Sequence, residues 1–96
     1  MTLQERAAKG AQLLDERRPD WANFVSVNIL EMNYLHTCVL GQLFGNYAAG
    51  CNQLSLEPED GKTAELGFRT NGREDWKLLN SAWKNEIEKR QLTSAS

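Results

Sequence analysis

The chain has 96 residues, of which 41% are hydrophobic and 25% are charged. This length suits one domain, and the composition is close to that of ordinary folded proteins, which excludes a disordered chain. Proteins that bind the nucleic-acid backbone usually carry a clear excess of Lys and Arg, whereas this chain has 11 basic and 13 acidic residues. We therefore expect a single domain over residues 1–96 without general affinity for nucleic acid.

The sequence carries no signal for export or membrane insertion. Residues 1–14 contain no uninterrupted apolar run, and no stretch approaches the roughly 20 apolar residues that span a bilayer. The two cysteines, Cys38 and Cys51, are too few for a disulfide framework and lie in an apolar stretch. These features predict a cytoplasmic protein with no membrane contact.

Residues 2–17 have the pattern of an amphipathic helix. Thr2 and Glu5 have the spacing of a capping box, in which each side chain satisfies a free backbone N–H. Apolar or small residues follow at intervals of three and four, namely Leu3, Ala7, Gly10 or Ala11, and Leu14. Because Pro19 prevents helical continuation, we expect the helix to end near Arg17.

Residues 20–34 give a weaker signal with two interpretations. Val25–Ile29 is rich in β-branched residues and partly alternating, which indicates a short extended segment. Asn28 could equally cap a single helical turn through Met32. We favour an extended segment followed by one turn.

The apolar stretch from Thr37 to about Leu54 predicts one central helix. Its large apolar residues repeat at intervals of three and four: Leu40, Leu43, Phe44, Tyr47, Cys51 and Leu54. Small residues recur on another face at Gly41, Gly45 and Ala49. Since each glycine inside a helix costs about 1 kcal/mol relative to alanine, we interpret these three as helix-packing positions that admit a neighbouring backbone.

A short acidic helix is expected within Leu56–Leu66. Pro58 suits the first helical position, carboxylates suit the first turn, and Gly67 suits the end. The acidic residues Glu57, Glu59 and Asp60 lack the alternating oxygen ligands of a calcium loop. We interpret them as a solvated surface.

The last helix is predicted to begin at Asn71, with Glu74 returning the capping bond three residues later. One face carries Trp76, Leu79, Trp83 and Ile87. The helix is expected to end near Arg90, and the tail over residues 91–96 should fray. Tryptophans on such a face normally belong to the core, but one of them, above all Trp83, could anchor a partner protein.

These elements predict a mainly α-helical fold. We expect a compact single-domain bundle of three main helices with short helical or extended connectors. In this bundle the first and last helices clasp the central one.

No motif supports catalysis, a cofactor or a metal ion. Ser81 and Lys84 have the S-x-x-K spacing of serine enzymes with a lysine base, but the companion motifs are missing. His36 and Cys38 are two residues apart, a spacing that points them away from each other on a helix. Together with Cys51, these residues form no C-x-x-C or H-x-x-x-H pair that could bind a metal. On one continuous helix, Cys38 and Cys51 would be roughly 20 Å apart. Because the glycines form no phosphate loop either, we predict a non-enzymatic protein without cofactors.

Three stretches carry a family resemblance: Arg6–Trp21, Cys38–Gly50 (CVLGQLFGNYAAG) and Leu79–Arg90. They resemble a family of small proteins encoded by actinobacteriophages, notably mycobacteriophages, and by actinobacterial genomes. The chain has Leu35 where relatives often have a further cysteine, and Asp20 where they usually have glycine. The resemblance implies a short phage or prophage accessory protein in the cytoplasm of the host cell, with no activity attached to the family.

The leading hypothesis is a non-enzymatic protein that binds another protein, either a second copy of itself or a host target. The expected partner-binding residues are Trp76, Leu79, Trp83 and Ile87. The alternative is nucleic-acid binding through a basic patch on the C-terminal helix, formed by Arg69, Arg73, Lys77, Lys84, Lys89 and Arg90. Residues 69–90 contain only six positive charges against four negative ones, which makes this the weaker hypothesis.

Overall fold

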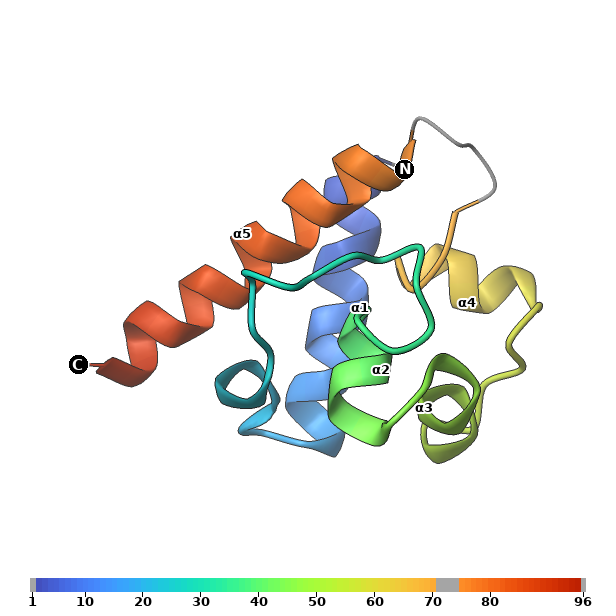
Figure 1. The fold of residues 1–96 in the computed structure, drawn as a ribbon, viewed down its shortest axis with the longest axis horizontal. Coiled ribbons are helices and arrows are strands. Elements are labelled where there is room, and N and C mark those ends of the chain that lie inside the picture. Colours follow the sequence, from blue (N-terminus) through green and yellow to red (C-terminus); the bar gives the residue numbers. More distant parts are fainter. Residues whose placement is uncertain (1, 71–74, 96) are drawn as a thin grey trace.

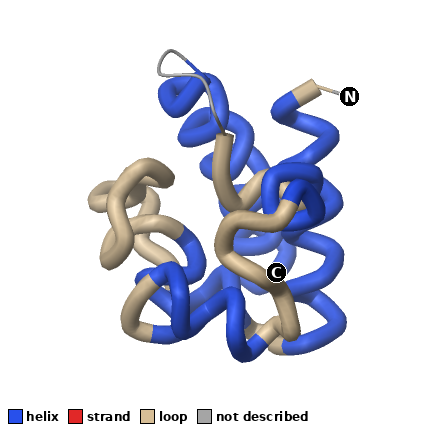
Figure 2. The backbone as a smooth tube through the Cα atoms, turned by 90° about the vertical axis from the view of Figure 1, so that its right-hand side faces the viewer, coloured by secondary structure: helices blue, strands red, loops and turns tan. Residues whose placement is uncertain are grey.

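The computed structural model describes residues 2–70 and 75–95, with side chains up to Gln91. These residues form helices joined by loops and contain no strand (Figures 1 and 2). In chain order the elements are α1 (Leu3–Arg17), the 3-10 helix η1 (Trp21–Phe24), α2 (Val39–Phe44), α3 (Tyr47–Gln53), α4 (Gly61–Glu65) and α5 (Asp75–Ala95). The predicted mainly α-helical fold is confirmed.

Helix α1 begins and ends where the sequence predicts. The Thr2 hydroxyl oxygen accepts a hydrogen bond from the backbone N–H of Glu5 at 3.1 Å and donates to its carboxylate at 3.2 Å. The helix ends at Arg17, just before Pro19. Its apolar face is buried, and it consists of Ala7, Gly10, Ala11 and Leu14.

Residues 25–38 form a loop of turns without a strand, and its helix-like bond, from the Cys38 N–H to the Tyr34 carbonyl at 3.1 Å, lies after the turn expected at Asn28–Met32. This corrects both interpretations of the segment beyond Val25. The side-chain amide of Gln42 explains the absence of strand pairing near Ser26. It accepts from the Ser26 N–H at 2.7 Å and donates to the Ser26 carbonyl at 3.2 Å. A side chain thus satisfies the backbone groups that a neighbouring strand would otherwise pair.

The predicted central helix is two short helices, α2 and α3, with a break at Gly45 and Asn46. Gly45 has φ +101°, a conformation that L side chains rarely adopt. The Asn46 side chain then caps α3 by accepting from the Ala49 N–H at 2.8 Å. A new cap directly after a left-handed residue starts a second helix instead of continuing the first.

The predicted helix-packing role therefore needs correction. A Cβ atom on Gly41 would collide with the Leu35 carbonyl oxygen, so this glycine admits a loop backbone and not a helix. Gly45 is exposed with open space around it, and Ala49 is half-buried on the separate helix α3. Gly50 is the second tightly packed glycine of this region, since its Cβ would lie 2.6 Å from that of Leu40.

Helix α4 is shorter than predicted, and α5 is longer. Helix α4 begins at Gly61 and not at Pro58, because Asp60 caps it by accepting from the Lys62 N–H at 3.3 Å. It ends before Gly67, as expected. The expected caps of the last helix, Asn71 and Glu74, lie outside the described residues. Helix α5 is helical as far as Ala95, so it includes most of the tail that the sequence analysis expected to fray.

Helices α1 and α5 pack directly against each other (Figure 1) and make the largest interhelical contact in the described structure. The predicted arrangement, with these helices clasping the central one, is therefore wrong. Trp83 of α5 is fully buried between them and donates its indole N–H to the Gly67 carbonyl at 2.6 Å. Its ring meets Trp21 edge to face at 5.9 Å and stacks on Phe68 at 5.5 Å. The aromatic core thus joins α1, η1, α5 and the segment after α4.

A charged cluster fastens the outer side of the α1–α5 contact. The Arg90 guanidinium donates two hydrogen bonds of 2.9 Å to the Asp15 carboxylate, and it also donates to the Glu86 carboxylate at 3.0 Å and to the Glu86 carbonyl at 2.9 Å. The Arg90 charge also lies 5.5 Å from the ring centre of Trp21, whose indole N–H donates to Asp15 at 2.8 Å. The pKa of Asp15 is lowered, chiefly by the hydrogen bonds from Arg90.

Replacement of Gly45 by alanine should destabilise the fold through backbone strain, and not through overpacking. A side chain at φ +101° costs about 1–3 kcal/mol. The control is Gly61→Ala, because Gly61 is also free of neighbours and has no positive φ. Its replacement should be neutral or stabilise by up to about 1 kcal/mol. Urea unfolding of both variants checks this, and equal midpoints would contradict the left-handed turn.

The Asp15–Arg90 ion pair should make stability depend on pH below about 4. A carboxyl group with a lowered folded-state pKa stabilises the fold above its unfolded pKa of about 4 and loses that contribution as pH falls through the folded value. Because Asp15 is partly exposed, Asp15→Asn should cost no more than about 1 kcal/mol at neutral pH. The difference from wild type should vanish in acid.

Urea unfolding between pH 7 and pH 2 measures this difference. Asp20→Asn is the matched control, because the exposed Asp20 side chain makes no capping hydrogen bond. An Asp15→Asn deficit that persists unchanged at pH 2 would contradict the assignment.

Candidate functional site

The face of α5 that was expected to bind a partner belongs to the core. Leu79, Trp83 and Ile87 are fully buried, and Trp76 is half-buried. The hypothesis that Trp83 anchors a partner is therefore wrong, because its ring and its N–H are already in contact with the protein's own aromatic residues and backbone. Of the four, Trp76 alone keeps partly exposed surface, so the face as a whole is not a partner site.

A pocket of about 430 Å³ lies between the 32–38 loop, α3, the segments 58–59 and 68–70, and the start of α5. Four aromatic side chains line it: Tyr34, Tyr47, Phe68 and Trp76. The other lining residues are Met32, Asn33, Leu35, Cys38, Pro58, Glu59, Arg69 and Thr70. We call this hollow the aromatic pocket. Its size lies in the range of ligand-binding pockets, and its walls are mostly apolar.

Hydrogen bonds hold the wall on the side of residues 57–60. The Tyr47 hydroxyl donates to the Pro58 carbonyl at 2.8 Å. The Arg69 guanidinium donates to the carbonyls of Glu59 at 2.7 Å and Asp60 at 3.1 Å. Burial raises the pKa of Tyr47 still further above neutral, so its phenol remains a hydrogen-bond donor. This wall is thus a fixed surface.

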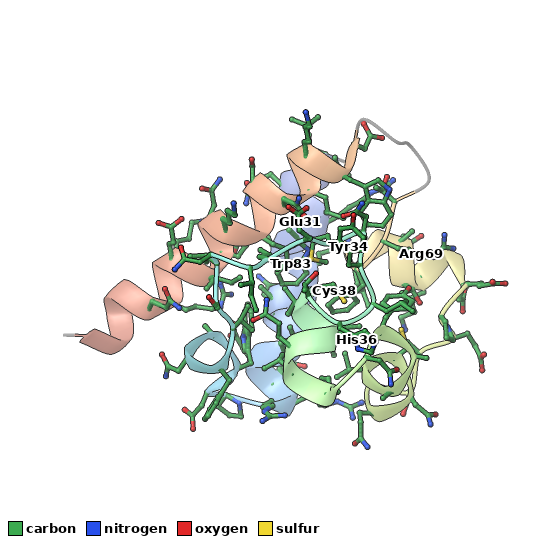
Figure 3. The ribbon with its side chains drawn as sticks, viewed as in Figure 1. Glu31, Tyr34, His36, Cys38, Arg69 and Trp83 are labelled. Atoms are coloured by element: carbon green, nitrogen blue, oxygen red, sulfur yellow. The ribbon has the colours of Figure 1, made fainter. Side chains whose placement is uncertain are left out.

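Two large apolar side chains that line the pocket, Tyr34 and Leu35, are mostly exposed, and we call them the rim residues. They are 61% and 60% exposed, respectively. Their backbone is held in place, because the Tyr34 carbonyl accepts from Cys38 N–H at 3.1 Å and the Leu35 carbonyl accepts from Tyr47 N–H at 2.9 Å. Figure 3 shows Tyr34 beside Arg69, with Cys38 on the same side of the molecule. The rim thus exposes apolar surface on a fixed backbone.

Local sequence patterns do not indicate this pocket. Of its aromatic residues, Trp76 is among the predicted partner-binding residues and Tyr34 is not, while Leu35 enters only as a departure from the family pattern. The one available signal was an aromatic and an aliphatic residue side by side in a segment without helical or strand periodicity. That signal could not show that residues 58–59 and 68–70 approach the same place.

The structure bonds His36 and Cys38 to different backbone groups. The Nδ1–H of His36 donates to the Gly45 carbonyl at 2.9 Å, whereas the Cys38 sulfur caps α2 by accepting from the Gly41 N–H at 3.2 Å. Burial raises the pKa of Cys38 and of Cys51. The break at Gly45 also means that the two cysteines do not lie on one helix, so the expected separation of about 20 Å does not apply.

The other chemical candidates are not assembled into sites. No group of three His, Cys, Asp or Glu within residues 2–70 and 75–95 could hold a metal ion. Ser81 is exposed on α5. Within the proposed basic patch, Lys89 and Arg90 both pair with Glu86, at 3.2 and 3.0 Å, and Arg73 lies outside the described residues. Two of the basic side chains of the patch are thus paired with a carboxylate of the protein itself.

Among the described residues, no helix combines the length and the apolar character that crossing a membrane requires. No protein-family model, curated protein or solved structure matches this chain. A functional proposal therefore has to rest on the structure itself, and above all on the aromatic pocket and its rim.

Both cysteines should react slowly with a thiol-alkylating reagent in the folded protein. Their thiols are buried and their pKa values are raised, so little thiolate is accessible at neutral pH. We expect alkylation by iodoacetamide at least about 100-fold slower than in urea, because the reagent must wait for local opening. Mass spectrometry of quenched samples gives the rates. Rapid labelling of native Cys38 would indicate an activated thiol.

Proposed function

We propose that this protein is a non-enzymatic accessory factor that acts by binding another protein through the aromatic pocket and its rim. The observation that carries this proposal is the exposure of Tyr34 and Leu35, both more than half exposed, at the edge of an aromatic hollow. Adjacent exposed apolar residues mark interaction sites, and aromatic anchors beside a pocket contribute most of the binding free energy in protein interfaces.

The rigidity of the pocket favours binding. The rim backbone is bonded to α3 through Leu35 and Tyr47, and the wall at Pro58 and Glu59 is held by the hydrogen bonds of Tyr47 and Arg69. A surface that is ordered before association loses less conformational entropy when the partner arrives. This supports a site that binds a partner without prior rearrangement.

The chemistry of the pocket supports binding and not catalysis. Cys38 is the nucleophilic side chain that lines it, and burial raises its pKa, which lowers the fraction of reactive thiolate. The neighbouring His36 side chain is bonded to the Gly45 carbonyl. The group that would activate the thiol is thus engaged elsewhere.

The resemblance to small actinobacteriophage proteins supplies the proposed biological setting. Under this proposal the protein is a phage or prophage accessory factor in the cytoplasm of an actinobacterial host, where it requires no cofactor. Its partner is a protein: either another copy of the chain or a host component. The ion pairs of Lys89 and Arg90 with Glu86 give no support to the nucleic-acid alternative.

Replacement of Leu35 by aspartate should remove partner binding while leaving the fold intact. The matched control is Ile29→Asp, because Ile29 is an aliphatic residue of the same loop, is 55% exposed and does not line the pocket. Tagged wild-type and variant proteins are used to capture proteins from an actinobacterial lysate. We expect Leu35→Asp to reduce capture about tenfold or more and Ile29→Asp to leave it unchanged.

The proposal fails if the wild-type protein captures no partner and also does not associate with itself. It fails equally if both variants retain the same proteins as wild type, because binding would then not involve the rim.

A further inference from the structure

We infer that Asn80 of α5 is a positioning residue of the aromatic pocket. Its side chain does not line the pocket, but two hydrogen bonds from it hold the loop that carries the rim residues. In this way Asn80 sets the distance between that loop and Trp76, another wall of the pocket. The inference deepens the proposed function, on which the role of Asn80 in binding rests.

The rim residues belong to a closed loop of residues 31–37, which we call the rim loop. Two hydrogen bonds bridge its ends: the Glu31 N–H donates to the Thr37 carbonyl at 3.4 Å, and the Thr37 hydroxyl donates to the Glu31 carbonyl at 3.2 Å. Compact loops with adjoining ends are frequently functional. Because the ends are joined, the position of the rim depends on what anchors this loop to the rest of the fold.

One set of anchors connects the second half of the rim loop to the region of α2 and α3. The Gln42 side-chain amide donates to the Thr37 carbonyl at 2.9 Å, and the Tyr47 N–H donates to the Leu35 carbonyl at 2.9 Å. The bond of His36 to the Gly45 carbonyl lies in the same half. All three anchors hold residues 35–37, so they do not determine how the loop stands relative to α5.

Asn80 anchors the first half of the rim loop to α5. Its Oδ1 accepts from the Met32 N–H at 2.7 Å, and its Nδ2 donates to the Glu31 carboxylate at 3.0 Å. Figure 3 shows Glu31 close to α5 and Tyr34 further along the loop. Both ends of the Asn80 amide are thus engaged with the rim loop.

The same helix carries Trp76, which lines the pocket. Trp76 precedes Asn80 by four residues, so the two lie on the same side of α5 in successive turns. The loop contributes Met32, Tyr34 and Leu35 to the pocket lining. Since both the loop and Trp76 line the hollow, the Asn80 bonds fix the width of the pocket between them. A binding surface that is fixed in this way loses less conformational entropy on association.

Asn80→Asp tests this link by hydrogen exchange of the Met32 amide in the full chain. The new side chain still accepts from the Met32 N–H, but it places a second carboxylate against that of Glu31, and like charges repel. We expect the Met32 amide to exchange about tenfold faster or more than in wild type. Adding Glu31→Gln should restore the rate to within about twofold, because the new glutamine amide can donate to the new carboxylate.

Gln91→Glu is the matched control, because it is also an amide-to-carboxylate change on α5. Gln91 donates to the Ala22 carbonyl at 3.2 Å, away from the rim loop. This variant should leave the Met32 exchange rate at the wild-type value.

Fluorine NMR of the full chain labelled with 5-fluorotryptophan distinguishes the pocket from the core. The chain has three tryptophans, of which Trp76 lines the pocket while Trp21 and Trp83 are buried in the core. Asn80→Asp should move the Trp76 signal, which Trp76→Phe assigns, and leave the two core signals in place. Adding Glu31→Gln should return the Trp76 signal although the new carboxylate remains, which excludes a direct effect of that charge on the ring.

Three results would overturn the inference. One is an unchanged Met32 exchange rate and Trp76 signal in Asn80→Asp. Another is a change that Glu31→Gln does not reverse, because the contact between the two side chains would then not be its cause. The third is movement of all three tryptophan signals, because Asn80 would then support the core and not the pocket in particular.

Capture from the actinobacterial lysate separates this inference from the proposed function. If Leu35→Asp reduces capture, Asn80→Asp should reduce it too, and the double variant with Glu31→Gln should recover it. Full capture by Asn80→Asp would overturn the role of Asn80 in binding. If no capture depends on Leu35, the proposed function fails, while the exchange and fluorine measurements still decide whether Asn80 positions the rim loop.

Discussion

The burial of Trp83 is the constraint on which the arrangement of the helices depends. Its indole ring touches Trp21 on one side and Phe68 on another, and its N–H is bonded to the Gly67 carbonyl. Gly10 of α1 lies against the same ring, since a Cβ atom there would come within 2.9 Å of it. A large aromatic residue contributes much apolar burial, and its buried N–H requires an acceptor. Both needs are met only when α1, α5 and the segment after α4 come together.

The aromatic pocket depends on this core through Phe68. One face of the Phe68 ring stacks on Trp83, and the residue also lines the pocket with its neighbour Arg69. Arg69 in turn donates to the carbonyls of Glu59, which lines the pocket, and of its neighbour Asp60. The pocket is therefore built on the packed centre of the molecule, which explains how a domain of 96 residues can present a preformed concave surface.

The sequence by itself determined the features that depend on residues near one another in the chain. Thr2 and Glu5 start α1, and Pro19 follows its end, because capping and proline sterics act within a few residues. The spacing of Leu79 and Ile87 likewise placed them on one apolar face of α5, although that face was expected to bind a partner and is buried in the core. These local patterns suffice for the helical class and for the apolar faces of the long helices.

Only the tertiary structure decided what depends on contacts between distant segments. The Gln42 amide takes up the backbone of Ser26, and an apolar, periodic stretch becomes two helices at Gly45. Periodicity does not distinguish a buried tryptophan from an exposed one, so it marks Trp83 as a candidate anchor and gives no signal for Tyr34. Exposure is set by which segments cover a side chain, and that covering is a property of the whole fold, which no local pattern contains.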